Sequence, residues 1–162
     1  MKITIHGAGY VGLVSGSCLA DVGNEVLCVD VDEERVTALN RGEIPIYEPG
    51  LANLIKRNCD AGRLRFIADA TEAVAHGILQ FVAVGTPPAE DGSADLKYVI
   101  KVARAIGQNM EEYCVVVGKS TVPVGAADQV SEIVADELKQ RGVDIPFSVA
   151  SNPEFLKEGD AV

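Results

Sequence analysis

The 162 residues carry a formal net charge of −10, from 14 basic and 24 acidic residues, and 48% of them are hydrophobic. This size and composition fit one domain with a substantial core. The negative charge opposes long-range attraction to nucleic acid or anionic lipid, so we expect no nucleic-acid partner and no membrane partner.

The sequence has no apolar run near the roughly 20 residues that a membrane-spanning helix needs, and no basic-then-apolar leader. We therefore expect a cytoplasmic protein. The cysteines show no Cys-x-x-Cys spacing and three lie in apolar segments, so we expect them to be packing residues. With only two histidines beside them, no metal site is expected. The cysteines are Cys18, Cys28, Cys59 and Cys114.

Short apolar runs alternate along the chain with stretches that carry apolar residues at spacings of three and four. The runs predict six strands, at residues 3–5, 26–29, 64–66, 79–84, 114–117 and 147–149. The spaced stretches predict five helices, at residues 11–22, 33–39, 51–59, 96–110 and 124–138. This alternation predicts an α/β fold, with a doubly wound parallel sheet of six core strands and helices on both faces.

The first predicted strand runs directly into Gly7-Ala8-Gly9-Tyr10-Val11-Gly12, which opens the first predicted helix. Gly7 permits a tight turn, Gly9 lets a diphosphate approach the backbone, and Gly12 lets the helix pack close to the strand. The helix amino end attracts an anion through its free N–H groups and its dipole. We therefore predict a Rossmann dinucleotide site that also includes Tyr10 and Val11.

The second predicted strand ends at Asp30, 23 residues after Gly7, where a carboxylate would accept hydrogen bonds from a ribose. This favours NAD over NADP, because a 2′-phosphate would meet like charge and Val31 is not an arginine. Arg35 is near enough to stack on adenine or reach a ribose, and we include it among the cofactor contacts. The alternative is that the glycines form only a compact turn and Asp30 caps the next helix.

Three loops follow in chain order. Residues 41–51 lengthen the third crossover with a turn-rich stretch, and its Tyr47 and Glu48 are either a loop anchor or part of the site. The second loop, residues 85–92, follows the fourth strand. The third, Ser120-Thr121-Val122-Pro123, follows the fifth strand and predicts a helix start with a hydroxyl N-cap and a proline in the first turn.

Several motifs together resemble those of the UDP-glucose/GDP-mannose dehydrogenase family, and the resemblance covers essentially all 162 residues. The stretch from Asp91 to Leu96 favours the branch of the family that acts on UDP-glucose. Besides Asp30, the motifs are Tyr47-Glu48-Pro49-Gly50, Val84-Gly85-Thr86-Pro87, Asp91-Gly92-Ser93-Ala94-Asp95-Leu96, Lys119-Ser120-Thr121-Val122-Pro123 and Asn152-Pro153-Glu154-Phe155-Leu156-Lys157-Glu158-Gly159.

The resemblance implies an NAD-dependent enzyme that oxidises the C6 alcohol of a nucleotide sugar to a carboxylate in two steps. The intermediates it implies are a thiohemiacetal and a thioester on a cysteine. It also implies that Gly85 and Thr86 contact the cofactor. Thr121 is expected beside the nicotinamide and the reacting carbon, where it could hold a water as well as act as an N-cap.

By the same resemblance, Glu154 activates the water that hydrolyses the thioester, and Glu158, one helical turn later, supports the sugar side. A carboxylate that reaches the water can act as a general base, and a partly dry cleft would raise its pKa. Backbone groups of Phe155, Leu156, Lys157 and Glu158 are expected to contact the substrate. The alternative for Glu154 is an acidic residue that completes a helix amino end after Pro153.

The family's nucleophilic cysteine and its catalytic lysine and asparagine lie beyond the motif at residues 152–156, so we expect this chain alone to be inactive. A central helix, which makes the homodimer of the full-length enzyme, and a UDP-sugar domain are expected beyond Val162. Two alternatives stay open. One is a sibling enzyme acting on GDP-mannose or a UDP-N-acetylhexosamine, and the other is an NAD-binding module without chemistry.

Overall fold

A computed structural model describes residues 1–89 and 92–162, so Asp91, with which the stretch favouring UDP-glucose begins, lies outside the described residues. One six-stranded sheet runs through the molecule in the order β3-β2-β1-β4-β5-β6, and every neighbouring pair is parallel. This confirms the predicted doubly wound sheet. The strands are β1 (Lys2–His6), β2 (Glu25–Val29), β3 (Leu64–Ile67), β4 (Leu79–Val82), β5 (Cys114–Gly118) and β6 (Phe147–Ser151).

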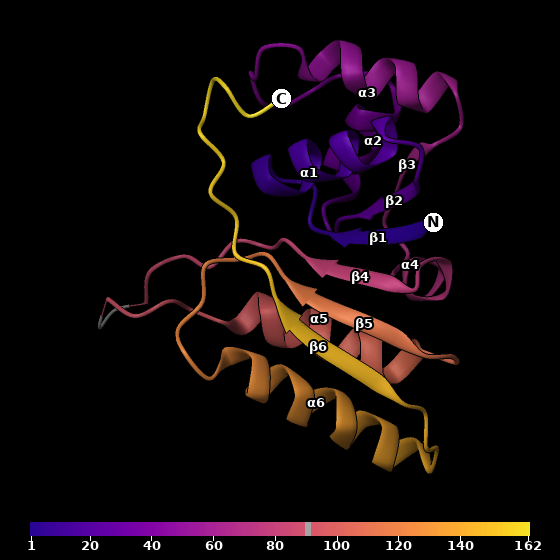
Figure 1. The fold of residues 1–162 in the computed structure, drawn as a ribbon, viewed down its shortest axis with the longest axis vertical. Coiled ribbons are helices and arrows are strands. Elements are labelled where there is room, and N and C mark those ends of the chain that lie inside the picture. Colours follow the sequence, from indigo (N-terminus) through magenta and orange to yellow (C-terminus); the bar gives the residue numbers. More distant parts are fainter. Residues whose placement is uncertain (90–91) are drawn as a thin grey trace.

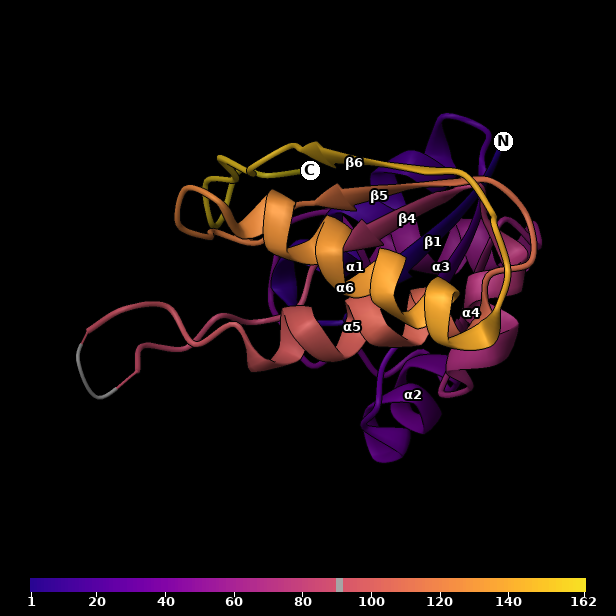
Figure 2. The same ribbon diagram turned by 90° about the horizontal axis from the view of Figure 1, so that it is seen from below.

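Helices cover both faces of this sheet. In Figures 1 and 2, α1 and α3 lie on one face, while α4, α5 and α6 lie on the other. The helices of the described residues are α1 (Tyr10–Asp21), α2 (Glu33–Asn40), α3 (Leu51–Asp60), α4 (Ala70–His76), α5 (Lys97–Asn109) and α6 (Ala126–Arg141). No helix in the described part of the chain is both long and apolar enough to cross a bilayer.

The core consists of two clusters of apolar side chains. The first joins β1, β2 and β3 to α1 and α3, and includes the fully buried Ile5 and Leu13. The second joins β4 and β5 to α5 and α6 around Ile106, Val116 and Val134, each at 0% exposure. Full burial of each such side chain stabilises the fold by about 1.5–3 kcal/mol. Both clusters brace the strands whose ends carry the site.

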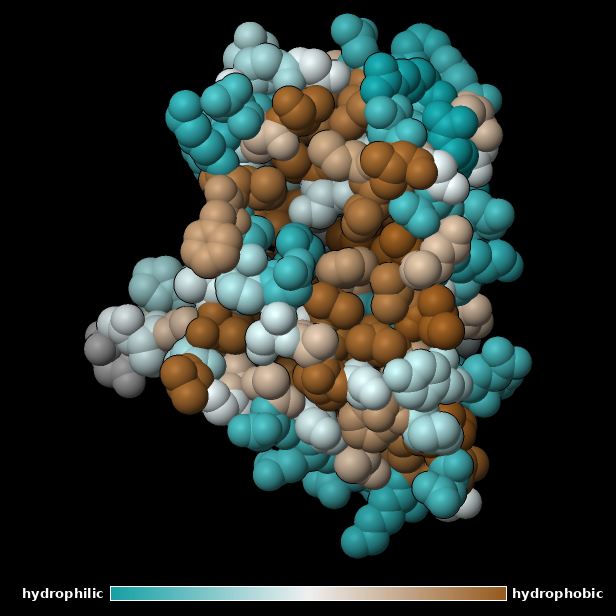
Figure 3. Space-filling view, viewed as in Figure 1, coloured by the Kyte–Doolittle hydropathy of each residue, from teal (hydrophilic) through white to brown (hydrophobic). Residues whose placement is uncertain are grey.

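The face of β4, β5 and β6 turned toward the viewer in Figure 1 carries no helix among the described residues. Apolar side chains gather across the middle of the same view in Figure 3. Leu79 and Phe81 of β4 are only partly buried there, at the margin of the first cluster. This half of the sheet is therefore the less protected one.

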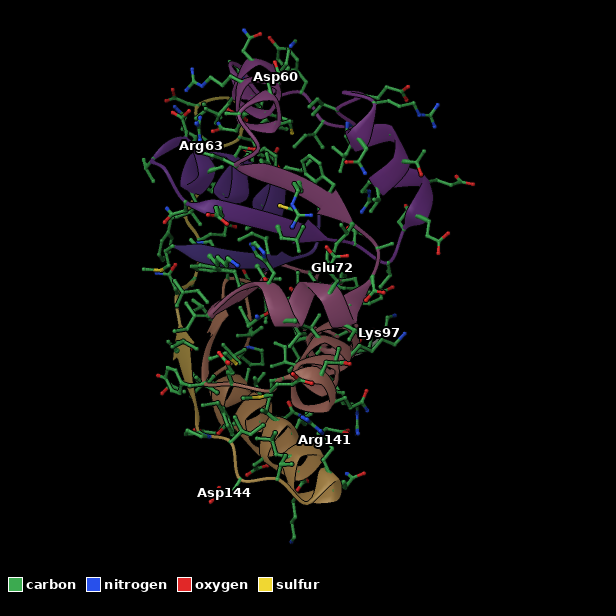
Figure 4. The ribbon with its side chains drawn as sticks, turned by 90° about the vertical axis from the view of Figure 1, so that its right-hand side faces the viewer. Asp60, Arg63, Glu72, Lys97, Arg141 and Asp144 are labelled. Atoms are coloured by element: carbon green, nitrogen blue, oxygen red, sulfur yellow. The ribbon has the colours of Figure 1, made fainter. Side chains whose placement is uncertain are left out.

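Figure 4 shows charged side chains at both ends of the helices, with Lys97 at the start of α5 and Arg141 at the end of α6. Arg141, in the last turn of α6, donates hydrogen bonds of 2.7 and 2.8 Å to the carbonyl oxygens of Gly107 and Met110. A cation beside these carbonyls satisfies acceptors that the end of α5 leaves free. Arg141 thereby fastens the ends of α5 and α6 together.

The sequence missed α4. This helix has seven residues, of which only Ala73 and Val74 are buried, so its apolar pattern is too short to show a period. A capping signal was present, because the Asp69 carboxylate accepts hydrogen bonds from the amides of Thr71 and Glu72 at 2.7 and 2.9 Å. The predicted end of the fourth strand was also two residues too late, since β4 ends at Val82.

The predicted start of α6 was wrong. The helix begins at Ala126, after Gly125 with φ of 91°, and neither Ser120 nor Thr121 caps it. The Ser120 hydroxyl instead donates a 2.7 Å hydrogen bond to the carbonyl of Val84. A contact between neighbouring strand ends has therefore taken the hydroxyl that the sequence assigned to the cap.

Candidate functional site

The candidate site lies at the carboxyl ends of the strands, where the strand order changes direction between β1 and β4. The chain leaves β1 toward β2 on one side, and leaves β4 toward β5 on the other. Loops that diverge at such a point leave a crevice, which is where doubly wound sheets bind their ligands. The arrowheads of β1 and β4 point to this edge in Figure 1.

Two glycines of the first loop are required by the fold itself. Gly7 has φ of 106°, and a Cβ there would lie 2.7 Å from the carbonyl oxygen of Ala83. A Cβ on Gly12 would overlap the carbonyl oxygen of Gly7. The loop and α1 could not pack this closely with any larger residue at either position.

Gly9 is different, because nothing in the fold requires a glycine there. Its φ and ψ of −80° and −167° suit any residue, and a Cβ would meet no atom within 4 Å. Gly9 is the N-cap of α1 and makes no side-chain cap, so the first amides of the helix carry no such partner. A Cβ would fill the space over these amides that a diphosphate needs, so the loop fits a dinucleotide.

The Asp30 side chain lies beside this loop, at the end of β2, and is 10% exposed. Its carboxylate accepts hydrogen bonds from the amides of Ala8 at 2.7 Å and Asp32 at 3.0 Å, and from Arg35 at 3.2 Å. A carboxylate has about four acceptor positions, so one remains for a ribose hydroxyl. The Arg35 side chain is 38% exposed, so it can move aside and free a second acceptor position on the carboxylate.

The alternative that Asp30 merely caps the next helix is not supported. Asp32 is the N-cap of α2, and its carboxylate accepts a 3.0 Å hydrogen bond from the amide of Arg35. The guanidinium of Arg35 lies 3.7 Å from the same carboxylate. Asp30 is therefore left to hold the glycine-rich loop and to face the crevice.

Five of the predicted site residues line one pocket of about 140 Å³ next to the start of α1. They come from four separate segments, so only the fold brings them together. The Thr86 hydroxyl donates a 3.0 Å hydrogen bond to the carbonyl of Thr121, which ties the loops after β4 and β5 together. The five residues are Val11, Gly85, Thr86, Thr121 and Glu154.

A larger hollow, of about 390 Å³, lies at the opposite edge of the sheet between residues 74–78 and 110–114. It contains none of the predicted site residues. It also lies at the amino ends of the strands, whereas parallel sheets bind ligands at the carboxyl ends. We therefore place the candidate site at the smaller pocket.

The segment after β6 forms no helix, which rules out the alternative for Glu154 and corrects the helical spacing expected for Glu158. Residues 152–162 contain only a turn, so Glu154 does not complete a helix amino end and Glu158 is not one helical turn away from it. The Glu154 carboxylate instead accepts a 2.6 Å hydrogen bond from the amide of Leu156. This bond holds the carboxylate at the pocket by a local turn.

The four residues after Glu154 differ in their surroundings. The Phe155 side chain is 92% exposed, and Lys157 and Glu158 are exposed as well. Leu156 packs against the first apolar cluster and so anchors the segment. The segment thus presents its backbone and its carboxylates, rather than a wall of buried side chains.

Tyr10 connects the glycine-rich loop to this segment. Its hydroxyl donates a 2.8 Å hydrogen bond to the carboxylate of Glu48. Burial raises the pKa of Tyr10 to about 12, with further contributions from that bond and from the negative charges of Glu48, Glu158 and Glu154. Three carboxylates therefore act on the pKa of one phenol, and Glu48 is the one that contacts it directly.

Glu48 is the residue of this region that the sequence left undecided. It is 5% exposed and accepts hydrogen bonds from the amides of Gly159 and Ala161, at 2.8 and 2.9 Å. The loop-anchor interpretation is therefore correct for Glu48, while Tyr47 is 90% exposed. The sequence showed only a turn-rich loop and gave no signal for a contact 111 residues away.

None of the four cysteines has the environment of a nucleophile. All four are free thiols. Burial raises the pKa of Cys18, Cys28 and Cys59, and raises the pKa of Cys114 to about 11. A nucleophilic cysteine needs the opposite shift, because the thiolate is the reactive form.

The sequence and architecture of this chain are similar to those of known dehydrogenases. The chain matches the UDP-glucose/GDP-mannose dehydrogenase family, NAD binding domain, over residues 1–162. It is 52% identical over 162 residues to a UDP-glucose 6-dehydrogenase of Pseudomonas aeruginosa, a match that covers 100% of this chain and 36% of that relative.

Two solved structures extend the comparison. A UDP-glucose dehydrogenase from the archaeon Pyrobaculum islandicum matches with a TM-score of 0.91 and 46% identity, over 98% of this chain and 37% of that one. A ternary complex of GDP-mannose dehydrogenase from Pseudomonas aeruginosa matches with a TM-score of 0.91 and 38% identity, over 99% and 38% of the two chains. The chain thus spans about a third of the length of these relatives.

Proposed function

Because this chain belongs to the UDP-glucose/GDP-mannose dehydrogenase family, as its NAD binding domain, we propose that it supplies the cofactor site of a nucleotide-sugar 6-dehydrogenase. The reaction is the oxidation of UDP-glucose to UDP-glucuronate in two successive two-electron steps. The nucleophile, the rest of the sugar site and the central helix belong to the part of the full-length enzyme that follows this chain.

The open space over Gly9 is the observation that supports binding of the cofactor. Gly9 sits at the amino end of α1 with an ordinary backbone conformation and open space where its Cβ would be. A diphosphate over Gly9 would receive hydrogen bonds from the first amides of α1, those of Tyr10, Val11 and Gly12 among them, and would lie at the positive end of the helix dipole.

Asp30 and Arg35 would hold the adenosine end of NAD. The carboxylate has one free acceptor position for a ribose hydroxyl, and the Arg35 guanidinium beside it would stack on adenine. A 2′-phosphate would face the Asp30 charge at close range, and the exposed Val31 offers no compensating cation. NAD is therefore preferred to NADP.

The nicotinamide end would reach the pocket lined by Val11, Gly85, Thr86, Thr121 and Glu154. When bound there, NAD accepts the hydride from the sugar C6 carbon. Thr121 would hold a water or the reacting oxygen, and Glu154 would take the proton from the water that hydrolyses the thioester left by the second oxidation. Backbone groups of Phe155 to Glu158 would contact the sugar, and Glu158 would support it from the solvent side.

The choice of UDP-glucose is supported by likeness. The relatives named for UDP-glucose share more identical residues with this chain than the GDP-mannose enzyme does. A sibling activity on GDP-mannose or a UDP-N-acetylhexosamine is the nearest competitor, since the base and the sugar substituents are read mainly outside this domain. The pocket at Glu154 favours an enzyme over an NAD-binding module without chemistry, because such a module has no use for a carboxylate there.

The full-length enzyme would be cytoplasmic, would act as a homodimer and would bind no nucleic acid. Four free thiols fit a reducing compartment, where disulfides are rare. The net charge of −10 opposes binding to nucleic acid.

The test is turnover by the full-length polypeptide that contains this chain. We expect about two NADH per sugar acid formed, because two hydrides leave the same carbon and each reduces one NAD. UDP-glucose should be oxidised faster than GDP-mannose or UDP-N-acetylglucosamine. One NADH per sugar with an aldehyde product, or a preference for GDP-mannose, would overturn the proposal.

A further inference from the structure

Glu48 is a buried carboxylate that joins its own loop to two other segments of the site. Its Oε2 accepts hydrogen bonds from the Tyr10 hydroxyl and the Gly159 amide, both at 2.8 Å, and its Oε1 accepts from the Ala161 amide at 2.9 Å. These donors lie in the glycine-rich loop region and in the segment after β6, 38 to 113 residues away along the chain.

At its start, the segment after β6 is attached by Asn152, whose amide donates to the Gly118 carbonyl and whose side chain accepts from Lys119. Residues 152–162 make no helix or strand, and among them Leu156 and Ala161 pack against the first apolar cluster. Val162 lies near Gly50, at 3.5 Å from where a Cβ on that glycine would be. The loop at residues 44–50 and the segment at residues 156–162 are thus packed together, with Glu48 as the polar link between them.

The charge on Glu48 is held in place by its donors. Backbone hydrogen bonds from Ala161 and then Gly159 hold the pKa of this carboxyl below its usual range, so it remains ionised at neutral pH. The negative charges of Glu154 and Glu158 also raise the pKa of the Tyr10 phenol, which donates its hydrogen bond to Glu48. Like charges repel, and the hydrogen bonds from Tyr10, Gly159 and Ala161 stabilise the negative charge of Glu48 against that repulsion.

We propose that Glu48 is a positioning residue, which sets the distance between the cofactor cradle and the carboxylates of Glu154 and Glu158 by clasping Gly159, Ala161 and Tyr10. The inference rests on the proposed function of that segment and deepens it. Its effect is indirect, because Glu48 touches Tyr10 and the backbone after Glu158 and reaches the reacting atoms only through them.

The first test is amide hydrogen exchange on Glu48→Gln. The glutamine side chain keeps the shape but has one acceptor oxygen for three donors, and its NH₂ group faces a donor. We expect the amides of Gly159 and Ala161 to exchange about tenfold faster or more, as loss of a hydrogen bond to a charged group predicts. Glu43→Gln is the matched control, because it removes the same charge from an exposed side chain of the same loop.

The exchange result decides between positioning and simple loss of stability. The amide of Gly7, bonded to the carbonyl of Val29 at 2.8 Å, reports on the sheet and should exchange at the wild-type rate. If Gly159 and Ala161 exchange at the wild-type rate in Glu48→Gln, Glu48 does not position this segment. Equal acceleration at Gly7 would also overturn the positioning role, because the effect would then be global unfolding.

The second test separates the two ligands in the full-length polypeptide. We expect Glu48→Gln to lower kcat/KM for the nucleotide sugar about tenfold or more while the Kd for NAD changes less than about threefold, since the misplaced groups are on the sugar side. Glu48→Asp, which restores the charge, should recover part of the loss. Equal losses in kcat/KM for the sugar and in affinity for NAD would contradict the positioning role. A wild-type protein that binds no NAD would instead contradict the proposed function, while the hydrogen-exchange test of Glu48 would remain valid.

Discussion

The amide of Ala8 donates a 2.7 Å hydrogen bond to Oδ2 of Asp30, and so joins the glycine-rich loop to the end of β2. The loop is fixed a second time by the 2.8 Å bond from the Gly7 amide to the Val29 carbonyl. The two parts of the proposed cofactor site are therefore held at a set distance by the protein alone. A preformed site of this kind avoids the entropy cost of ordering a loop on binding.

Two alanine substitutions distinguish the glycine that ligand binding needs from the glycine that folding needs. Gly9→Ala places its methyl in open space, so we expect unfolding free energy within about 0.5 kcal/mol of wild type and NAD affinity at least about tenfold lower. Gly12→Ala collides with the Gly7 carbonyl, and should cost about 1–3 kcal/mol of stability. Urea unfolding and calorimetric titration measure both. Wild-type NAD affinity in a folded Gly9→Ala protein would show that no ligand uses this space.

Asp30→Asn tests the preference for NAD. The neutral amide cannot repel a 2′-phosphate, and it weakens the bond from the Ala8 amide, so NADH affinity should fall about tenfold and the discrimination against NADPH should shrink. Glu34→Gln removes one charge from an exposed side chain of α2 and is the control. Tighter binding of NADPH than NADH by the unchanged protein would show that Arg35, rather than Asp30, governs the choice.

Much of this fold was predictable because strand-forming runs and the dinucleotide motif are local signals. All six strands and the helices α1, α2, α3 and α5 follow from apolar patterns within single segments, and Asp30 follows from its spacing to Gly7. The failures have a different cause. The start of α6 was misplaced because Ser120 bonds to the Val84 carbonyl on a neighbouring strand connection, and α4 is too short for its period to be visible.

The parts of the site that could not be predicted are those made by distant segments. From the sequence, Glu48 could be either a loop anchor or a site residue. Its hydrogen-bond donors Gly159 and Ala161 lie 111 and 113 residues away, and only the fold brings them to it. The alternative of a helix amino end at Glu154 is wrong, because a local hydrogen bond from the Leu156 amide holds the carboxylate instead. Whether Glu154 acts as a base stays a prediction.

Glu154→Gln in the full-length polypeptide tests that role. The amide keeps the size of the side chain but cannot accept a proton, so we expect formation of the sugar carboxylate to slow by about 100-fold or more. NAD affinity should change little. Asp160→Asn, an exposed residue that forms an ion pair with Lys157, is the matched control. Normal release of carboxylate by Glu154→Gln would remove this residue from the mechanism.

The buried histidine of β1 should make the domain sensitive to acid. His6 is 4% exposed, and burial lowers its pKa to about 4, against a smaller opposing contribution from the hydrogen bond with Gln80. The Gln80 amide donates to the carbonyls of Val74 and Gly77, so its oxygen accepts from Nε2–H of the neutral imidazole.

The sign follows from proton binding. Between pH 6.5 and about 4 the unfolded chain holds a proton on His6 that the folded chain does not, so stability is full above pH 6.5 and falls as the pH drops toward 4. Protonation of His6 should lower the free energy of unfolding by about 3 kcal/mol in total. Urea unfolding across this range measures the loss, and NMR titration of His6 identifies its source. Titration of His6 near pH 6.5 would contradict the assignment, while His76→Gln should leave most of the slope in place.

The most direct test of the whole account is a crystal structure of this chain soaked with NAD. We expect the diphosphate over Gly9 at the amino end of α1, a ribose hydroxyl on the carboxylate of Asp30, and the nicotinamide at the pocket with Thr86 and Thr121. Dinucleotide bound at another edge of the sheet, or a crevice between β1 and β4 that stays empty at saturating NAD, would contradict it.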